Sequence, residues 1–353
     1  SDASNQLDGW PGRADATDEC PYLLQASVRR STPVVHSATL NADPSVVEKK
    51  GNLTWPSNAS VSNDYVFIHI PKCAGTSFKA DAALVVAPSR FRENDEQPWK
   101  STPHGDSHVN MVILRSPLVH VLSQFMECKY DFWGSMTSAG TAFPRLPGLY
   151  GGMDEWISHF VGLQEEPMDG APPNSKEWAE AANYRCYNPW NMQTRYLATT
   201  WGHSAPFDKL EPDVNQAIDV LKSLEFVGLS EFYVESLCLL TWHRHGSVPN
   251  TCACGGQGPL SETSHVEHFV PDHAISDLSP ALVKKMQKLI RMDAQLYASA
   301  LKQFEANLQN ASKITGVKIL CPGHFDQTWS EVNQLLGELN LGNVTTLNRS
   351  ANS

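Results

Sequence analysis

Short apolar runs and longer amphipathic runs alternate along the central part of this chain. The runs 66–70, 109–114 and 226–229 are rich in Val, Ile, Leu and Phe, which is typical of strands buried in a parallel sheet. A segment with helical spacing of apolar positions follows each of them. This alternation predicts an α/β domain with a central parallel sheet flanked by helices. The expected helices cover 76–86, 118–125, 153–163, 176–184, 214–224, 231–243, 279–308 and 329–339.

Less regular segments at the two ends divide the chain into three parts. Residues 1–62 are rich in Ser, Asn, Asp and Pro and show little periodicity, which predicts an irregular N-terminal arm. Residues 63–310 contain every strand–helix unit and are expected to form the main domain. Residues 311–353 hold one further amphipathic run, so we expect a C-terminal extension packed on that domain.

The first strand–helix junction has the composition of an anion site. Segment 70–77 reads Ile-Pro-Lys-Cys-Ala-Gly-Thr-Ser: the proline ends the strand, the small residues allow a tight turn, and the hydroxyl residues open a helix. Free N–H groups and the dipole at a helix start attract phosphate, and Lys72 adds a full charge. The alternative is an ordinary strand–turn–helix with a solvated lysine. The predicted cradle comprises Pro71, Lys72, Cys73, Ala74, Gly75, Thr76 and Ser77.

The second junction adds a guanidinium and a hydroxyl. Arg115 follows the strand 109–114, and Ser123 lies two helical turns further on. Both side chains can reach one phosphate group, since guanidinium pairs well with phosphate oxygens. The alternatives are a surface ion pair for Arg115 and a neutral helix position for Ser123. Two such motifs in order favour a functional site over these alternatives.

Together the two motifs resemble those of sulfotransferases that use 3′-phosphoadenosine 5′-phosphosulfate (PAPS), and most closely the Golgi-type carbohydrate sulfotransferases. The resemblance implies a P-loop-type three-layer sandwich, with the sulfotransferase catalytic domain spanning 63–310. It also implies that Lys72 and the cradle hold the 5′-phosphosulfate, while Arg115 and Ser123 hold the 3′-phosphate. PAPS would be the co-substrate and 3′-phosphoadenosine 5′-phosphate (PAP) the product. The acceptor would be a hydroxyl group, with a carbohydrate favoured.

Sulfuryl transfer to an alcohol requires a general base in addition to Lys72. His104 is the first candidate, because His-Gly-x-x-His-Val resembles a motif of uronosyl sulfotransferases. His108, in the same motif, is the second candidate. Glu93 is the third, since its spacing from Pro71 resembles that of the carboxylate base in tyrosylprotein sulfotransferases. His69, inside the first predicted strand, is expected to be structural.

The net charge and the composition of the chain limit the kinds of partner that it is expected to bind. The 353 residues carry a formal net charge of −11, which argues against nucleic acid and against a highly sulfated acceptor unless a local basic groove overrides it. No apolar run approaches the roughly 20 residues needed to cross a bilayer. Because the chain begins with Ser1 rather than Met, we expect a form from which a signal or membrane anchor was removed. Oligomeric state is not predicted.

The eight cysteines favour an oxidising compartment, here the secretory pathway and the Golgi lumen. We expect Cys73 to be free and Cys238 to be a buried thiol. A zinc site involving Cys252 and Cys254 fits the usual ligand spacing poorly, so no metal is predicted. The bridge candidates are Cys20, Cys128, Cys186, Cys252, Cys254 and Cys321. Sequons that would make the chain a glycoprotein occur at Asn52, Asn58, Asn310, Asn343 and Asn348.

Other functions fit part of the pattern. A P-loop kinase or hydrolase using ATP and magnesium would share the first junction, but its Lys directly precedes the hydroxyl residue, whereas Lys72 comes early in the loop. A binding protein on a decayed sulfotransferase scaffold is a further alternative. Protein tyrosine and small-molecule alcohols stay open as acceptors.

Overall fold

A computed structural model describes residues 64–94, 96–103, 105, 107–137, 145–165, 186–199, 211–264 and 270–342. The expected arm at 1–62, the expected helix at 176–184 and the base candidate His104 lie outside these ranges. The strands are β1 (Asp64–Ile68), β2 (Phe91–Glu93), β3 (His108–Leu114) and β4 (Phe226–Leu229). The α-helices are α1 (Gly75–Val86), α2 (Pro117–Tyr130), α3 (Phe132–Thr137), α4 (Met153–Glu165), α6 (Met192–Ala198), α7 (Val214–Ser223), α8 (Tyr233–His245), α9 (Pro280–Leu289), α10 (Arg291–Thr315) and α11 (Pro322–Glu338).

The four strands form one parallel sheet in the order β2-β1-β3-β4. β1 pairs with both β2 and β3, and β4 pairs with β3. The expected α/β class with a central parallel sheet is therefore confirmed. β2 was not predicted, because three residues in a polar stretch carry almost no periodic signal.

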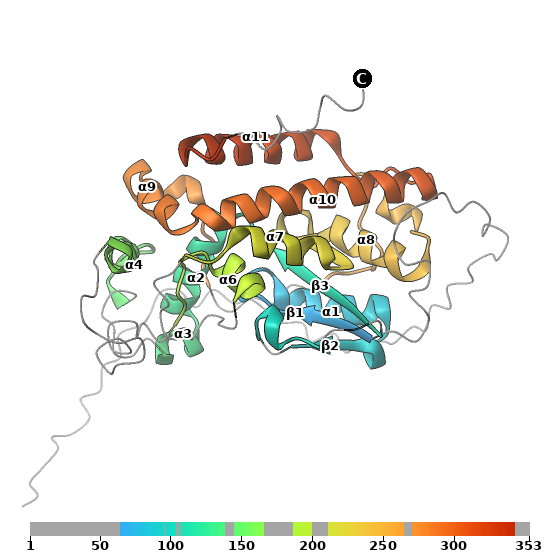
Figure 1. The fold of residues 1–353 in the computed structure, drawn as a ribbon, viewed down its shortest axis with the longest axis horizontal. Coiled ribbons are helices and arrows are strands. Elements are labelled where there is room, and N and C mark those ends of the chain that lie inside the picture. The colour runs from blue at the N-terminus through green and yellow to red at the C-terminus, as the bar shows by residue number, and fades with distance from the viewer. Residues whose placement is uncertain are drawn as a thin grey trace, which may run out of the picture. The chain divides into compact units, whose positions relative to one another are not determined.

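The order of the strands creates a switch point between β1 and β3. The chain leaves β1 toward β2 on one side and leaves β3 toward β4 on the other. Right-handed crossovers in opposite directions place their helices on opposite faces. Accordingly α1 packs with α8, whereas α6, α7 and α10 pack with one another, as in a three-layer sandwich (Figure 1).

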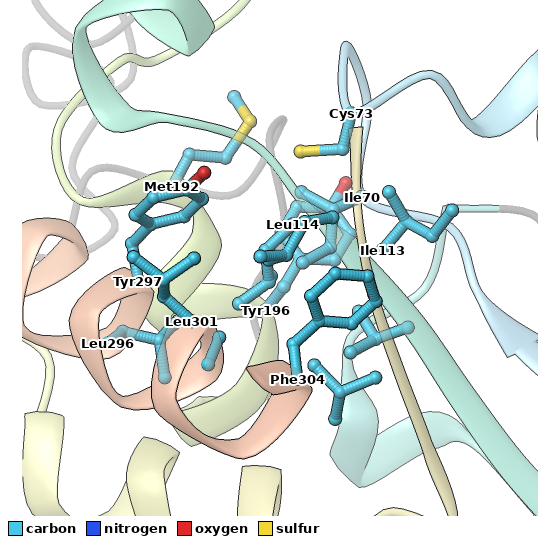
Figure 2. Packing of buried hydrophobic residues seen from close by; sticks show 14 of the residues in the cluster. Ile70, Cys73, Ile113, Leu114, Met192, Tyr196, Leu296, Tyr297, Leu301 and Phe304 are labelled. Carbon is cyan, nitrogen blue, oxygen red and sulfur yellow. The ribbon is translucent and has the colours of Figure 1, made fainter. Parts of the chain in front are cut away.

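A continuous apolar core holds the first junction against the long helix α10. Figure 2 shows Ile70 and Cys73 from the loop after β1 beside Leu114 of β3, with Tyr297 and Leu301 of α10 across from them. All five side chains are almost fully buried. The ends of β1 and β3 are thus fixed relative to each other by packing at the base of the loop.

The long helix expected over 279–308 is two helices in the structure. It breaks at Ile290, where α9 ends and α10 begins. Asn191 stabilises the break, because its N–H donates to Leu289 O at 2.7 Å and its Oδ1 accepts from Met292 N at 2.9 Å. Asn191, nearly 100 positions away in the chain, provides hydrogen-bond partners for backbone groups at the two helix ends. The periodicity of the helical segment itself therefore does not reveal the break.

Three disulfides join Cys128 to Cys186, Cys238 to Cys252, and Cys254 to Cys321. The prediction of disulfides is confirmed, and Cys73 is a buried free thiol as expected. The prediction for Cys238 was wrong, because its apolar helix packs beside the 3-10 turn that carries Cys252. Cys20 lies outside the described residues.

The disulfide between Cys254 and Cys321 links the start of α11 to the main domain. Phe325 and Leu336 of α11 belong to the same hydrophobic core as that domain. α11 lies along α10 (Figure 1). Of the helices in the described ranges, none has the length and apolar character needed to span a bilayer. The sequon at Asn310 falls within α10, and its Nδ2 atom, where a glycan would attach, is buried. The other four sequons lie outside the described residues.

Candidate functional site

A cavity of about 1410 Å³ lies at the carboxyl ends of the strands. His69 and Lys72 follow β1, Glu96 follows β2, Arg115 follows β3 and Ser230 follows β4, and all five line the cavity. The carboxyl edge of a parallel sheet, at its switch point, is where α/β proteins bind their ligands. The cavity therefore occupies the position at which the fold favours a ligand site.

The loop between β1 and α1 has an unusual backbone. Lys72 and Ala74 have φ of 63° and 62°, in the left-handed region that costs a non-glycine residue on the order of 1 kcal/mol. Ala74 is the N-cap of α1, and its methyl side chain cannot accept a hydrogen bond from the first turn. Ala74, Gly75, Thr76 and Ser77 all line the cavity, so the positive end of the helix dipole faces it.

Gly75 cannot carry a side chain at this position. A Cβ atom added there would lie 2.0 Å from Cδ2 of His69, whose ring packs under the start of α1. The small residue at the crown of the loop is thus required by close approach of the imidazole.

The Lys72 ammonium pairs with Glu127 of α2. The distance from Nζ to Oε2 is 2.6 Å, and the two side chains are only 14% and 7% exposed. Glu127 was not singled out from the sequence, because it lies 55 residues beyond Lys72 in a helix with no local signal for it. The pair holds the ammonium at the wall of the cavity.

The two junctions are joined directly. Arg115 donates from Nη1 to the carbonyl oxygen of Lys72 at 3.0 Å. Gln193 of α6 fixes Arg115 from the other side, accepting from its N–H and donating to its carbonyl, each at 2.9 Å. Ser123 of α2 is 6% exposed and lines the same cavity. The structure therefore brings Lys72, Arg115 and Ser123 together.

A buried histidine supports the loop from beneath. His120 Nε2 donates to Pro71 O at 2.8 Å, and Gln124 Nε2 donates to His120 Nδ1 at 3.2 Å. This pattern requires the neutral Nε2–H tautomer. Burial lowers the pKa of His120 to about 3, so the ring stays neutral at physiological pH.

His69 and Glu93 form a second pair at the edge of the cavity. His69 Nδ1 lies 2.5 Å from Glu93 Oε1, and Lys79 Nζ donates to Glu93 Oε2 at 2.9 Å. Burial lowers the pKa of His69. Burial acts to raise the pKa of Glu93, but the bonds from Lys79 and His69 outweigh it and lower the pKa. The carboxylate of Glu93 thus faces His69 and Lys79, while His69, expected to be structural, lines the cavity.

Glu96 is the acidic residue that faces the cavity after β2. Burial, followed by the nearby charge of Glu93, raises the pKa of Glu96 to about 7. A carboxyl group that titrates near neutral pH in a cleft is a candidate acid or base. Sequence reasoning missed it because β2 was not recognised, and an acid at the carboxyl end of a strand is the signal that would have identified it.

Of the two histidines that the sequence offers as the general base, His108 lies in the described part of the chain. His108 begins β3, at the amino edge of the sheet, where its Nδ1 lies 3.2 Å from Ser107 Oγ. The seven residues of β3 separate it from the cavity edge by roughly 20 Å. The structure therefore does not bring His108 near Lys72.

Part of the cavity lining comes from a segment that is hydrogen-bonded to α1. Asp81 accepts from Ser264 N at 2.9 Å and from Tyr233 OH at 2.9 Å. Thr263, Ser264 and Tyr233 line the cavity. The bond to Asp81 holds this segment over the start of α8.

The described part of the chain holds no cluster of three or more potential metal ligands. Cys252 and Cys254, considered for zinc, are both in disulfides and cannot serve as thiolate ligands. No protein-family model matches the chain, and a search of curated proteins finds no significant match.

Proposed function

We propose that this protein is a PAPS-dependent sulfotransferase that moves a sulfuryl group to an acceptor hydroxyl. The observation that carries the proposal is the meeting of two strand–helix junctions at one cavity. Lys72 and the helix start after β1 offer one anion site, and Arg115 with Ser123 offers a second. A nucleotide with phosphate groups at both its 5′ and 3′ positions matches two such sites.

The groups at the two strand–helix junctions have the charge and the hydrogen-bond donors needed to bind the donor nucleotide. The N–H groups at the start of α1, with Thr76 and Ser77, suit the 5′-phosphosulfate. Lys72 would stabilise charge on the leaving phosphate, and the cradle of the P-loop-type fold would orient it. Arg115 and Ser123 would bind the 3′-phosphate, which ordinary adenine nucleotides lack.

The proposed transfer requires that the reacting groups be positioned and that the acceptor hydroxyl lose its proton. The acceptor oxygen forms a bond to sulfur as the bond from sulfur to the phosphate oxygen breaks, and PAP leaves. The acceptor proton passes to a base. His104 remains the base predicted from the sequence, and Glu96 is the described side chain whose position in the cavity and pKa also suit this task.

The three disulfides support folding in an oxidising compartment, and we propose the Golgi lumen. A membrane anchor and glycans on the sequons at Asn52, Asn58, Asn343 and Asn348 belong to the same proposal.

The test compares nucleotides by thermal unfolding. PAP should raise the melting temperature of the wild-type protein more than ATP with magnesium does. Arg115→Lys should reduce the PAP shift, because an ammonium cannot form the bidentate pair, and the exposed residue Lys222 provides a control as Lys222→Arg. A larger shift with ATP and magnesium would favour a kinase or hydrolase, and no shift with either would favour a binding protein.

A further inference from the structure

One buried side chain contacts both of the loops that carry the proposed phosphate sites. Gln193, at the start of α6, accepts a hydrogen bond from Sγ of Cys73, in the loop after β1, at 3.6 Å. It also accepts from the N–H of Arg115 and donates to the carbonyl of Arg115, each at 2.9 Å. Gln193 is 1% exposed and is not among the described residues that line the cavity. It can therefore act on a ligand in this cavity through the two loops that it holds.

The amide group of Gln193 fixes Arg115 relative to the loop after β1. A side-chain amide carries its acceptor and its donor in one plane, so bonds to both backbone groups of Arg115 define the orientation of that residue. Arg115 in turn donates from Nη1 to the carbonyl oxygen of Lys72, the neighbour of Cys73, at 3.0 Å. Hydrogen bonds and covalent bonds thus form a closed circuit through Gln193, Arg115, Lys72 and Cys73, and this circuit connects the two proposed phosphate sites.

Gln193 projects from a rigid support. Asp293 of α10, which is 1% exposed, accepts from the N–H of Gln193 at 3.3 Å and from the N–H of Thr194 at 2.8 Å. Asn191, just before α6, is bonded to both sides of the break between α9 and α10. Since these bonds cap the start of α6 and tie it to the end of α9 and the start of α10, Gln193 sets the position of Arg115 rather than following it.

A fixed distance between two anion sites discriminates between nucleotides. Two linked groups bind more tightly than one only when their separation matches that of the two sites. A nucleotide with phosphates at its 5′ and 3′ positions presents one separation, and its 2′,5′ isomer presents another with the same charge. Arg115 held in place would reject the second geometry, whereas a mobile Arg115 could follow the displaced phosphate.

We propose that Gln193 is a positioning residue that sets the distance between the two phosphate sites and thereby selects adenosine 3′,5′-bisphosphate, which is PAP, over adenosine 2′,5′-bisphosphate. The inference rests on the proposed function and adds to it the residue that determines nucleotide specificity. Removal of the Gln193 amide leaves the charged groups of both sites in place. It should therefore reduce the discrimination between the two isomers more than it reduces the affinity for either of them.

The test measures the dissociation constants of the two isomers by calorimetry. The wild type should bind PAP more tightly than the 2′,5′ isomer by about tenfold or more. Gln193→Met keeps the length of the side chain and removes its hydrogen bonds, so the ratio of the two constants should fall by about threefold or more. Gln303→Met is the matched control, because Gln303 of α10 donates to Leu221 O and is not among the described lining residues. It should keep the wild-type ratio.

Three results would overturn the inference and leave the sulfotransferase proposal standing, because PAP still binds in each. They are equal binding of the two isomers by the wild type, a wild-type ratio retained in Gln193→Met, and the same fall of the ratio in Gln303→Met. If Gln193→Met does not fold, Gln193→Glu is judged in its place, since it keeps the acceptor and loses the donor to Arg115 O. If neither variant folds, the wild-type ratio decides. Absence of PAP binding by the wild type would instead overturn both proposals.

Discussion

The Nζ atom of Lys72 lies 2.6 Å from Oε2 of Glu127, and this ion pair joins the loop after β1 to the second half of α2. Lys72 thereby lines the same cavity as the start of α1 and Arg115. In the proposed reaction, the transferred sulfuryl group would pass next to this ammonium.

Lys72→Met should lower the rate of sulfuryl transfer about 100-fold or more, because a positive charge at the leaving phosphate is lost. It should also destabilise the protein by about 2 kcal/mol, since Glu127 becomes a nearly buried charge without its partner. Adding Glu127→Gln should recover most of the stability and none of the activity. Turnover with labelled PAPS and chemical denaturation measure the two effects. Recovery of activity in the double variant would contradict the role of Lys72, and Lys222→Met serves as the exposed control.

Glu96→Gln tests the carboxyl group that faces the cavity. If Glu96 accepts the acceptor proton, kcat/KM of the wild type should fall as the pH drops below about 7, where its carboxylate becomes protonated. The glutamine variant should lose this dependence and at least tenfold in kcat, with PAP affinity retained. His104→Ala is measured in parallel, and loss of turnover in that variant alone would assign the proton to His104.

His120 makes stability depend on pH. Its folded-state pKa of about 3 lies below the ordinary value of 6.5, so the unfolded chain takes up a proton first as the pH falls. The stability that this neutral ring contributes is complete above pH 6.5 and declines toward pH 3, by roughly 1.4 kcal/mol per pH unit. His120→Gln should show a shallower decline than the wild type in urea unfolding between pH 6.5 and 4. A parallel decline would contradict the assignment.

The disulfide between Cys128 and Cys186 should matter more for the acceptor than for the nucleotide. It closes a separation of 58 residues, and its loss from the paired Ser variant should cost about 4 kcal/mol. The folded fraction of this variant should still show the increase in melting temperature that PAP produces in the wild type, because the loop after β1 is held by His120 and Gln193. Acceptor binding should weaken, since Tyr187, which lines the cavity, follows the lost bridge. An equal loss of acceptor and PAP binding would show that the region around Tyr187 and the loop after β1 are not independent.

The meeting of Lys72 and Arg115 at one cavity could be predicted from the sequence because both residues follow recognisable strands. Lys72 and Arg115 each come directly after an apolar run, and parallel strands bring their carboxyl ends to one edge whatever lies between them in the chain. Glu96 follows the same rule, but the strand before it is too short to be recognised.

The sequence by itself determined the α/β class, the parallel sheet and the chemistry of the two junctions, since local periodicity and turn residues are properties of neighbouring positions. Only the tertiary structure decided that Glu127 pairs with Lys72, that Cys238 bridges to Cys252, that Asn191 divides the last long helix, and that Trp133 packs against Tyr187. Each of these contacts joins segments whose approach depends on how the helices pack on the sheet, and no local pattern encodes that packing.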